Sequence, residues 1–188
     1  MAQSKKNVVI HGMSGKLGGL VVFRQRFGKT LLTTAPGTRT KEQSAAQQEI
    51  TNRFQKAVVY AKSVLADPAV KAEYKAAAGE GRSAYNLAIA DFFNSPSILN
   101  VDVSAYTGEA GQPIMMQVTD DYKVKSVSIA IRNADDSVVE EGMAVQQANL
   151  LDWVYTTTTA NPAIAGDKVV VTATDYPRNV TKFEQILG

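Results

Sequence analysis

Val124-Lys125-Ser126-Val127-Ser128-Ile129-Ala130-Ile131-Arg132 alternates large apolar side chains with polar or small ones. A period of two places successive side chains on opposite faces of a strand, so this stretch predicts a strand over residues 124–133 with one buried face. Runs of the same kind predict further strands at residues 98–105, 113–119, 138–143, 151–159, 168–174 and 179–187. Seven short strands with no helix between them predict an antiparallel β-sandwich.

Upstream of the sandwich, apolar residues recur every three or four positions, which is typical of helices buried along one side. Thr40-Lys41-Glu42-Gln43 predicts a capping box at the start of a helix of about 25 residues. Asp67-Pro68 predicts the start of a second helix ending near Ala78, and residues 82–93 predict a third. The side chains expected on the buried side of the third helix are Tyr85, Ala88, Ile89, Phe92 and Phe93. Asn94-Ser95-Pro96 ends the helical pattern and predicts a domain boundary.

The N-terminal segment is rich in glycine and β-branched residues. Residues 20–27 and 30–34 flank Gly28-Lys29 and predict a β-hairpin. Alternation in the first strand puts its phenylalanines on one face and its arginines on the other. A lone two-stranded hairpin is marginally stable in water, so this one needs cover from its own helices or from a neighbouring subunit. We predict an assembly interface made of Phe23, Arg24, Arg26, Phe27 and Lys29.

Charge is distributed unevenly along the chain. Residues 1–57 contain ten Lys and Arg against two Glu, a balance of +8, and the remaining residues carry −6 because the whole chain carries +2. A basic head and an acidic remainder favour head-to-tail self-association or contact with nucleic acid. No helix-turn-helix or RNA-binding signature accompanies the basic residues.

Composition and spacing exclude several kinds of site. The chain has no cysteine and a single histidine, His11, which excludes a disulfide scaffold, a Cys-type zinc site and any site with two imidazoles. Gly12-Met13-Ser14-Gly15-Lys16 is too short for the G-x-x-x-x-G-K-[ST] phosphate loop, and Gly28-Lys29-Thr30 lacks the first glycine of that loop. We therefore predict no catalytic residue, no cofactor and no enzymatic activity.

Acidic pairs are the remaining candidates for a metal site. They are Asp120-Asp121, Asp135-Asp136 and Glu140-Glu141. None has the alternating spacing of a calcium loop, and the two aspartate pairs lie where turns favour Asp in any case. We therefore predict no metal ligand, with weak calcium binding at these pairs as the alternative.

Three runs resemble bacterial immunoglobulin-like domains. Val118-Thr119-Asp120-Asp121 with residues 124–129 is similar to their D-x-x-V-x-S-V strand, and Trp153-Val154-Tyr155-Thr156 is similar to their W-x-Y/F-T strand. Residues 169–181 resemble their closing V-T-A-T-D-x-x-G-N-x-T run, with Arg178 where glycine is common. The resemblance covers residues 98–188 and implies an adhesion, spacer or decoration module. The N-terminal half is similar to uncharacterised families of Bacteroidota, which imply no activity.

Together these observations predict an α+β chain. Residues 1–96 form a glycine-rich β-hairpin and three-helix assembly domain, and residues 97–188 form an immunoglobulin-like antiparallel β-sandwich. We predict a non-enzymatic, self-assembling subunit of a phage-type virion or filament, which forms homo-oligomers through the N-terminal arm. The alternatives are a nucleic-acid-binding architectural protein that uses the basic arm and a surface adhesin that uses the sandwich loops. No run of about 18 apolar residues and no signal-peptide core is present, so we expect cytoplasmic synthesis, no membrane span, and a place in a virion or extracellular assembly.

Overall fold

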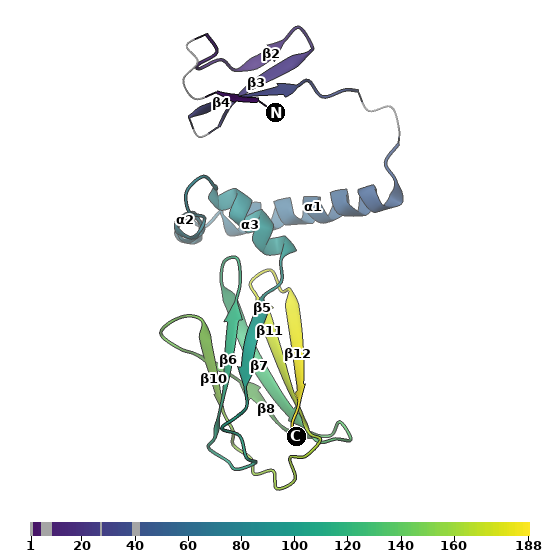
Figure 1. Cartoon of the computed structure of the whole chain (residues 1–188), viewed down its shortest axis with the longest axis vertical. Coiled ribbons are helices and arrows are strands. Elements are labelled where there is room, and N and C mark those ends of the chain that lie inside the picture. Colours follow the sequence, from purple (N-terminus) through teal and green to yellow (C-terminus); the bar gives the residue numbers. More distant parts are fainter. Residues whose placement is uncertain (1, 5–8, 27, 39–41) are drawn as a thin grey trace. The chain divides into compact units, whose positions relative to one another are not determined.

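The computed structural model describes residues 2–4, 9–26, 28–38 and 42–188. It divides into two compact units, residues 1–51 and 52–188. The described residues form a four-stranded sheet, three helices and then two further four-stranded sheets, which confirms the α+β class (Figure 1). The predicted boundary between residues 96 and 97 lies inside the second unit, and independent folding of residues 97–188 stays a prediction.

The first unit contains an antiparallel sheet in the order β1-β4-β3-β2. Its strands are β1 (Ala2–Ser4), β2 (Gly15–Leu17), β3 (Val21–Arg26) and β4 (Lys29–Thr34). Arg26 pairs with Lys29, so β3 and β4 form the predicted hairpin. Gly28 in the turn has a φ of +67°, which glycine adopts without steric cost. The sequence did not predict β1 and β2, because three residues are too few to show a period.

The predicted helices are present as α1 (Ala45–Val64), α2 (Pro68–Ala77) and α3 (Ala84–Phe93). The predicted start of the first helix was too early, and Thr40 and Lys41 lie outside the described residues. The capping box is instead formed by Ser44, whose Oγ accepts from the Gln47 backbone N–H while its own N–H donates to Gln47 Oε1. None of the helices in the described ranges has the length and apolar character needed to cross a membrane.

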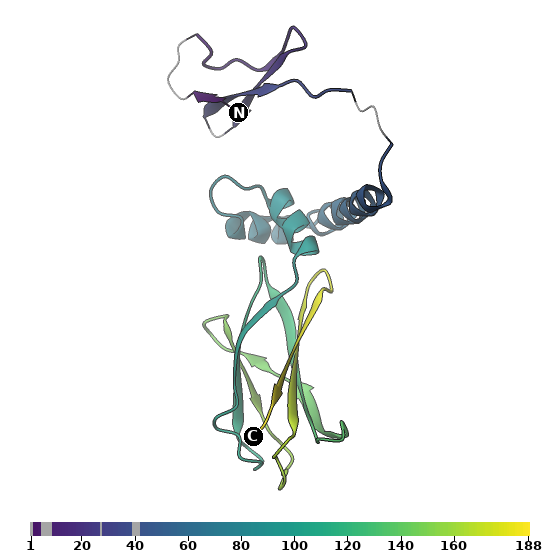
Figure 2. The same cartoon turned by 45° about the vertical axis from the view of Figure 1, so that its right-hand side comes forward.

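Two facing sheets form the sandwich, β5-β6-β10-β9 and β12-β11-β7-β8 (Figures 1 and 2). Their strands are β5 (Ser97–Asp102), β6 (Pro113–Thr119), β7 (Val124–Arg132), β8 (Val138–Met143), β9 (Val145–Gln146), β10 (Asp152–Thr156), β11 (Lys168–Asp175) and β12 (Val180–Ile186). Inward-facing side chains of both sheets, Ile129 and Trp153 among them, form one apolar core. The seven predicted strands are all present, and the short β9 was missed.

The helices pack at the end of the sandwich where β5 begins (Figure 1). Their own core is small and rich in alanine, with Tyr74 and Leu87 as its largest buried side chains. Tyr122, in the loop after β6, stacks on Tyr74 with 3.8 Å between ring centroids. The Tyr122 hydroxyl and the Lys123 ammonium both contact Glu73 Oε2, at 2.6 and 2.7 Å. The loop after β6 therefore fastens α2 to the sandwich.

Candidate functional site

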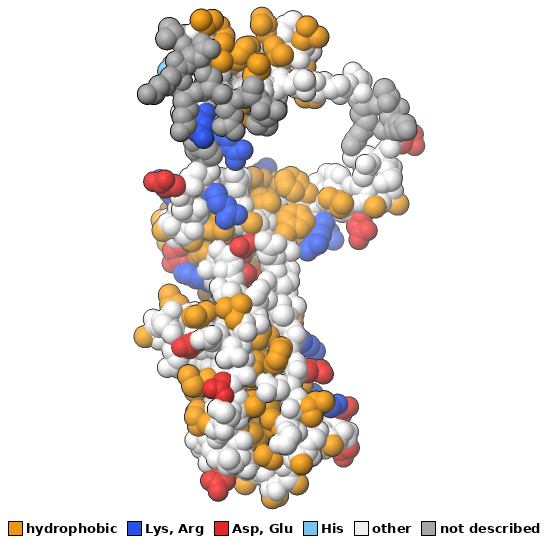
Figure 3. Space-filling view, viewed as in Figure 1, with side chains coloured by type: hydrophobic (Ala, Val, Ile, Leu, Met, Phe, Trp, Pro, Cys, Tyr) orange, Lys and Arg blue, Asp and Glu red, His pale blue; other side chains and the backbone are white. Residues whose placement is uncertain are grey.

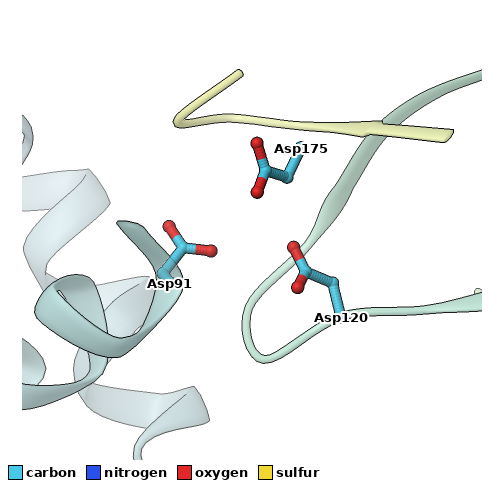
Figure 4. Close-up of side chains that lie close together, drawn as sticks. All are labelled: Asp91, Asp120 and Asp175. Atoms are coloured by element: carbon cyan, nitrogen blue, oxygen red, sulfur yellow. The ribbon is translucent and has the colours of Figure 1, made fainter. Parts of the chain in front are cut away.

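Three aspartates that are far apart in the sequence meet where α3 reaches the sandwich. Asp91 lies near the end of α3, Asp120 follows β6, and Asp175 is the last residue of β11. One carboxylate oxygen from each lies within 4.8 Å of the others, and the side chains point toward a common space (Figure 4). We call these three residues the acidic cluster.

Asp91 is fully buried and is held by two tyrosines. The Tyr74 hydroxyl donates to Asp91 Oδ2 at 2.6 Å, and the Tyr60 hydroxyl donates to the same oxygen at 3.2 Å. The other oxygen, Oδ1, has no hydrogen-bond partner among the described residues. The tyrosines thus fix the orientation of the carboxylate through Oδ2 and leave Oδ1 without a partner among the described residues.

Asp175 is also fully buried, and Asn179 orients it. Asp175 Oδ1 accepts from the Asn179 backbone N–H at 2.6 Å, and Oδ2 accepts from Asn179 Nδ2 at 2.7 Å. The same Nδ2 lies 2.9 to 3.3 Å from the carbonyl oxygens of Asn94, Asp91 and Phe92, where α3 ends. Asn179 therefore ties the turn between β11 and β12 to the C-terminus of α3.

Asp120 is the least buried member of the cluster. Its Oδ1 accepts from the Asp121 backbone N–H at 2.8 Å, whereas the buried Oδ2 has no partner among the described residues. Asp120 also lines an open groove of about 520 Å³, together with Phe93, Asn94 and Ser97 among others. Asp120 is thus the side of the cluster that a small solute can approach.

Burial raises the pKa values of all three carboxyl groups, and repulsion by neighbouring carboxylates adds to the rise at Asp91 and Asp120. Burial raises the pKa of Asp91 to about 6 against the lowering effect of the tyrosine hydrogen bonds, and the charges of Asp175 and Asp121 add to the rise. Burial raises the pKa of Asp120 to about 7, with further contributions from neighbouring carboxylates. Burial also raises the pKa of Asp175, although the Asn179 hydrogen bonds oppose it. The three groups therefore resist carrying three negative charges together.

The sequence carried a signal for the acidic cluster in the positions of its three aspartates. Asp120 is the next inward position of β6 after Ile114, Met116 and Val118. Asp175 likewise follows Val169, Val171 and Ala173 on β11. Asp91 continues the buried face of α3 formed by Ala84, Leu87 and Ala88, a face that the sequence had assigned to Tyr85 and its neighbours. In each element an acid occupies a position where the pattern calls for an apolar residue.

The register of the first sheet separates the predicted assembly residues onto two faces. Phe23 pairs with Leu32, and Val21 pairs with Leu17, so these four share an apolar face. The opposite face carries Lys16, Arg24, Arg26 and Lys29. Phe27 lies outside the described residues. Within the described part of this sheet Thr30 is buried, but no apolar side chain is.

The other residues singled out by the sequence serve local structure or lie exposed. Asp136 pairs with Lys168 at 2.9 Å. Glu140 is buried and its Oε2 accepts from the Tyr155 hydroxyl and from the Thr158 side chain and backbone. His11 is exposed.

No protein-family model and no curated protein matches the sequence. Among solved structures, CopC from Methylosinus trichosporium OB3b is similar at a TM-score of 0.36 and 17% identity, covering 48% of this chain and 88% of CopC. An engineered protein is similar at a TM-score of 0.33 and 18% identity, covering 47% of this chain and 19% of that one. Because both TM-scores are low, the fold is assigned from the strands and their register alone.

Proposed function

We propose that this chain is a non-enzymatic structural protein that self-assembles through the apolar face of its N-terminal sheet, as a subunit of a phage-type virion or filament. The observation that carries the proposal is the exposure of the apolar side chains of that sheet. Leu17 is 62% exposed, and no apolar side chain of the sheet is buried among the described residues. Figure 3 shows apolar side chains at the surface of this unit. A sheet gains stability by burying its apolar face against a second layer, and this sheet is a single layer.

A second copy of the chain is the partner that this face fits. The face formed by Leu17, Val21, Phe23 and Leu32 carries no charge, so two copies can stack on each other across a two-fold axis. The basic face cannot stack in this way because its like charges repel. It is instead directed outward, where the acidic part of another subunit sets the register at about 0–1 kcal/mol for each exposed ion pair.

The outer domain of this subunit is, in the proposal, an immunoglobulin-like sandwich. Strand order supports this assignment. If the eight strands from β5 to β12 are numbered 1 to 8, the strand orders of the two sheets are 1-2-6-5 and 8-7-3-4. This is the A-B-E-D and G-F-C arrangement of immunoglobulin-like sandwiches with one additional strand beside C. Trp153 and Tyr155, from the run that resembles those domains, lie in the core.

The experiment compares two neighbouring valines on β3 that point to opposite faces. Val21→Glu places a charge on the apolar face, and Val22→Glu places the same charge on the basic face. Light scattering after size-exclusion chromatography measures the oligomer. We expect an oligomer for the native chain and for Val22→Glu, and at least a tenfold weaker association for Val21→Glu. A native chain that is monomeric at high concentration, or equal effects of the two substitutions, would contradict the proposal.

The basic face favours a second candidate function, which is contact with nucleic acid. Lys16, Arg24, Arg26 and Lys29 share one face of the sheet. Such a face binds phosphates without sequence preference, and the affinity falls as counterions are added. Titration of random duplex DNA at several salt concentrations tests this function. Arg24→Gln should reduce the slope of log affinity against log salt by about one, whereas binding that is insensitive to salt would refute it.

A further inference from the structure

The geometry of the acidic cluster points to a ligand. Buried charges in proteins are paired with opposite charges or coordinate metals. The salt bridges of the described residues do not include Asp91, Asp120 or Asp175. Asp91 is fully buried, its side chain points toward the other two carboxylates (Figure 4), and its Oδ1 has no hydrogen-bond partner among the described residues. The Oδ2 atom of Asp120 is also buried and has no hydrogen-bond partner among the described residues.

We propose that Asp91, Asp120 and Asp175 bind a hard divalent cation, Ca²⁺ in preference to Mg²⁺, which fastens α3 to two loops of the sandwich. Two oxygens that share a calcium ion at about 2.4 Å each can be up to about 4.8 Å apart, so three carboxylate oxygens that lie within 4.8 Å of one another can share one ion. Mg²⁺ requires near-octahedral geometry, keeps several waters and is usually held by only one or two carboxylates, so a set of three favours Ca²⁺. A set of oxygens alone does not suit zinc, which prefers nitrogen and sulfur.

The residues around the cluster act as its supporting shell. Tyr74 and Tyr60 hold one oxygen of Asp91, and the Asp121 backbone N–H holds one oxygen of Asp120. In both residues the second oxygen is the one without a partner. Outer hydrogen bonds of this kind orient the ligands of metal sites and keep them from rotating away. The groove beside Asp120 supplies the route of entry.

Calorimetric titration of chelator-treated protein with CaCl₂ tests the site directly. We expect one ion per chain with a dissociation constant between about 1 µM and 1 mM, and binding at least tenfold weaker for MgCl₂. A second readout uses Tb³⁺, which enters calcium sites and luminesces when nearby tyrosines are excited. Excitation through Tyr60 and Tyr74 should give emission that Ca²⁺ abolishes. Absence of heat, of sensitised emission and of thermal stabilisation at about 10 mM CaCl₂ would overturn the proposal.

A matched pair of variants distinguishes this site from nonspecific binding to acidic surface. Asp120→Asn keeps the acceptor for the Asp121 N–H but removes a ligand charge, and should weaken Ca²⁺ binding at least tenfold. Glu184→Gln makes the same change of charge on the exposed side of β12 and should leave the affinity unchanged. Circular dichroism confirms that both variants are folded. Equal affinities for the native chain and Asp120→Asn would show that the ion binds elsewhere on the chain, and the proposal would fail.

Discussion

Replacing Asn179 by alanine should lower the free energy of unfolding of the unit formed by residues 52–188 by about 2 kcal/mol. Nδ2 of Asn179 lies 2.7 Å from Asp175 Oδ2 and 2.9 Å from the Asn94 carbonyl oxygen, with two longer contacts to α3. One amide nitrogen has two hydrogens, so at most two of these contacts are full hydrogen bonds. A neutral bond contributes about 1 kcal/mol and one to a carboxylate about 1.5 kcal/mol or more, and water that reaches this half-buried side chain offsets part of the loss.

Urea unfolding followed by tryptophan fluorescence measures this change. The chain has one tryptophan, Trp153, which is 5% exposed in the sandwich core and therefore reports the unfolding of this unit. The experiment is done at pH 8 with a chelator, so that the carboxylates are ionised and no cation contributes. Asn100→Ala on β5 is the control, because Asn100 is exposed and should change the stability by less than about 0.5 kcal/mol. Equal effects of the two substitutions would refute the assignment of Asn179 as the tie between α3 and the sandwich.

Three further predictions concern pH, backbone geometry and domain independence. The pKa values of Asp91 and Asp120 are raised to about 6 and about 7, so the folded chain holds protons that the unfolded chain releases near pH 4. The two rises, from 3.8 to about 6 and from 3.8 to about 7, correspond to a loss of stability in chelator of up to about 7 kcal/mol as the pH rises from about 4 to about 7.5. Urea unfolding measures this loss, and a rise in stability would contradict the burial of these groups. Gly108→Ala should lower the melting temperature far more than Gly111→Ala, because both glycines have φ near +90° but only a Cβ at Gly108 would lie 2.1 Å from a backbone oxygen. An expressed fragment of residues 97–188 should melt cooperatively with β-type circular dichroism, and a fragment that shows no transition would place the domain boundary elsewhere.

The sequence predicted the sandwich well because its strands are buried on one face. In β7 the alternation from Val127 to Ile131 is unbroken, and the same residues are buried in the structure. Local pattern failed where the element is too short to have a period, as in β2 and β9. It also misplaced the start of α1, because the capping box is formed by Ser44 and Gln47, four residues after the predicted one.

The acidic cluster required tertiary information for a different reason. Each aspartate, taken alone, has an ordinary local explanation. Asp120 stands at a turn, Asp175 ends a strand, and Asp91 is one polar residue on a short helix. Only the approach of α3 to the two sandwich loops makes the three a set. The sequence nevertheless shows that each aspartate continues the apolar side of its own strand or helix. This position, and not the preference of aspartate for turns, is the signal of a buried acid.

The composition of the helical core explains why the join between helices and sandwich depends on polar groups. Four of its six buried residues are alanine, which gains little from burial, and the other large apolar side chains packed against Tyr74 and Leu87 are only partly buried. The stacking of Tyr122 and the bonds of Asn179 add to this small core. The acidic cluster lies at the same join. Because the cluster repels itself when ionised and attracts a cation, the stability of the helices is set by the solution as well as by the chain.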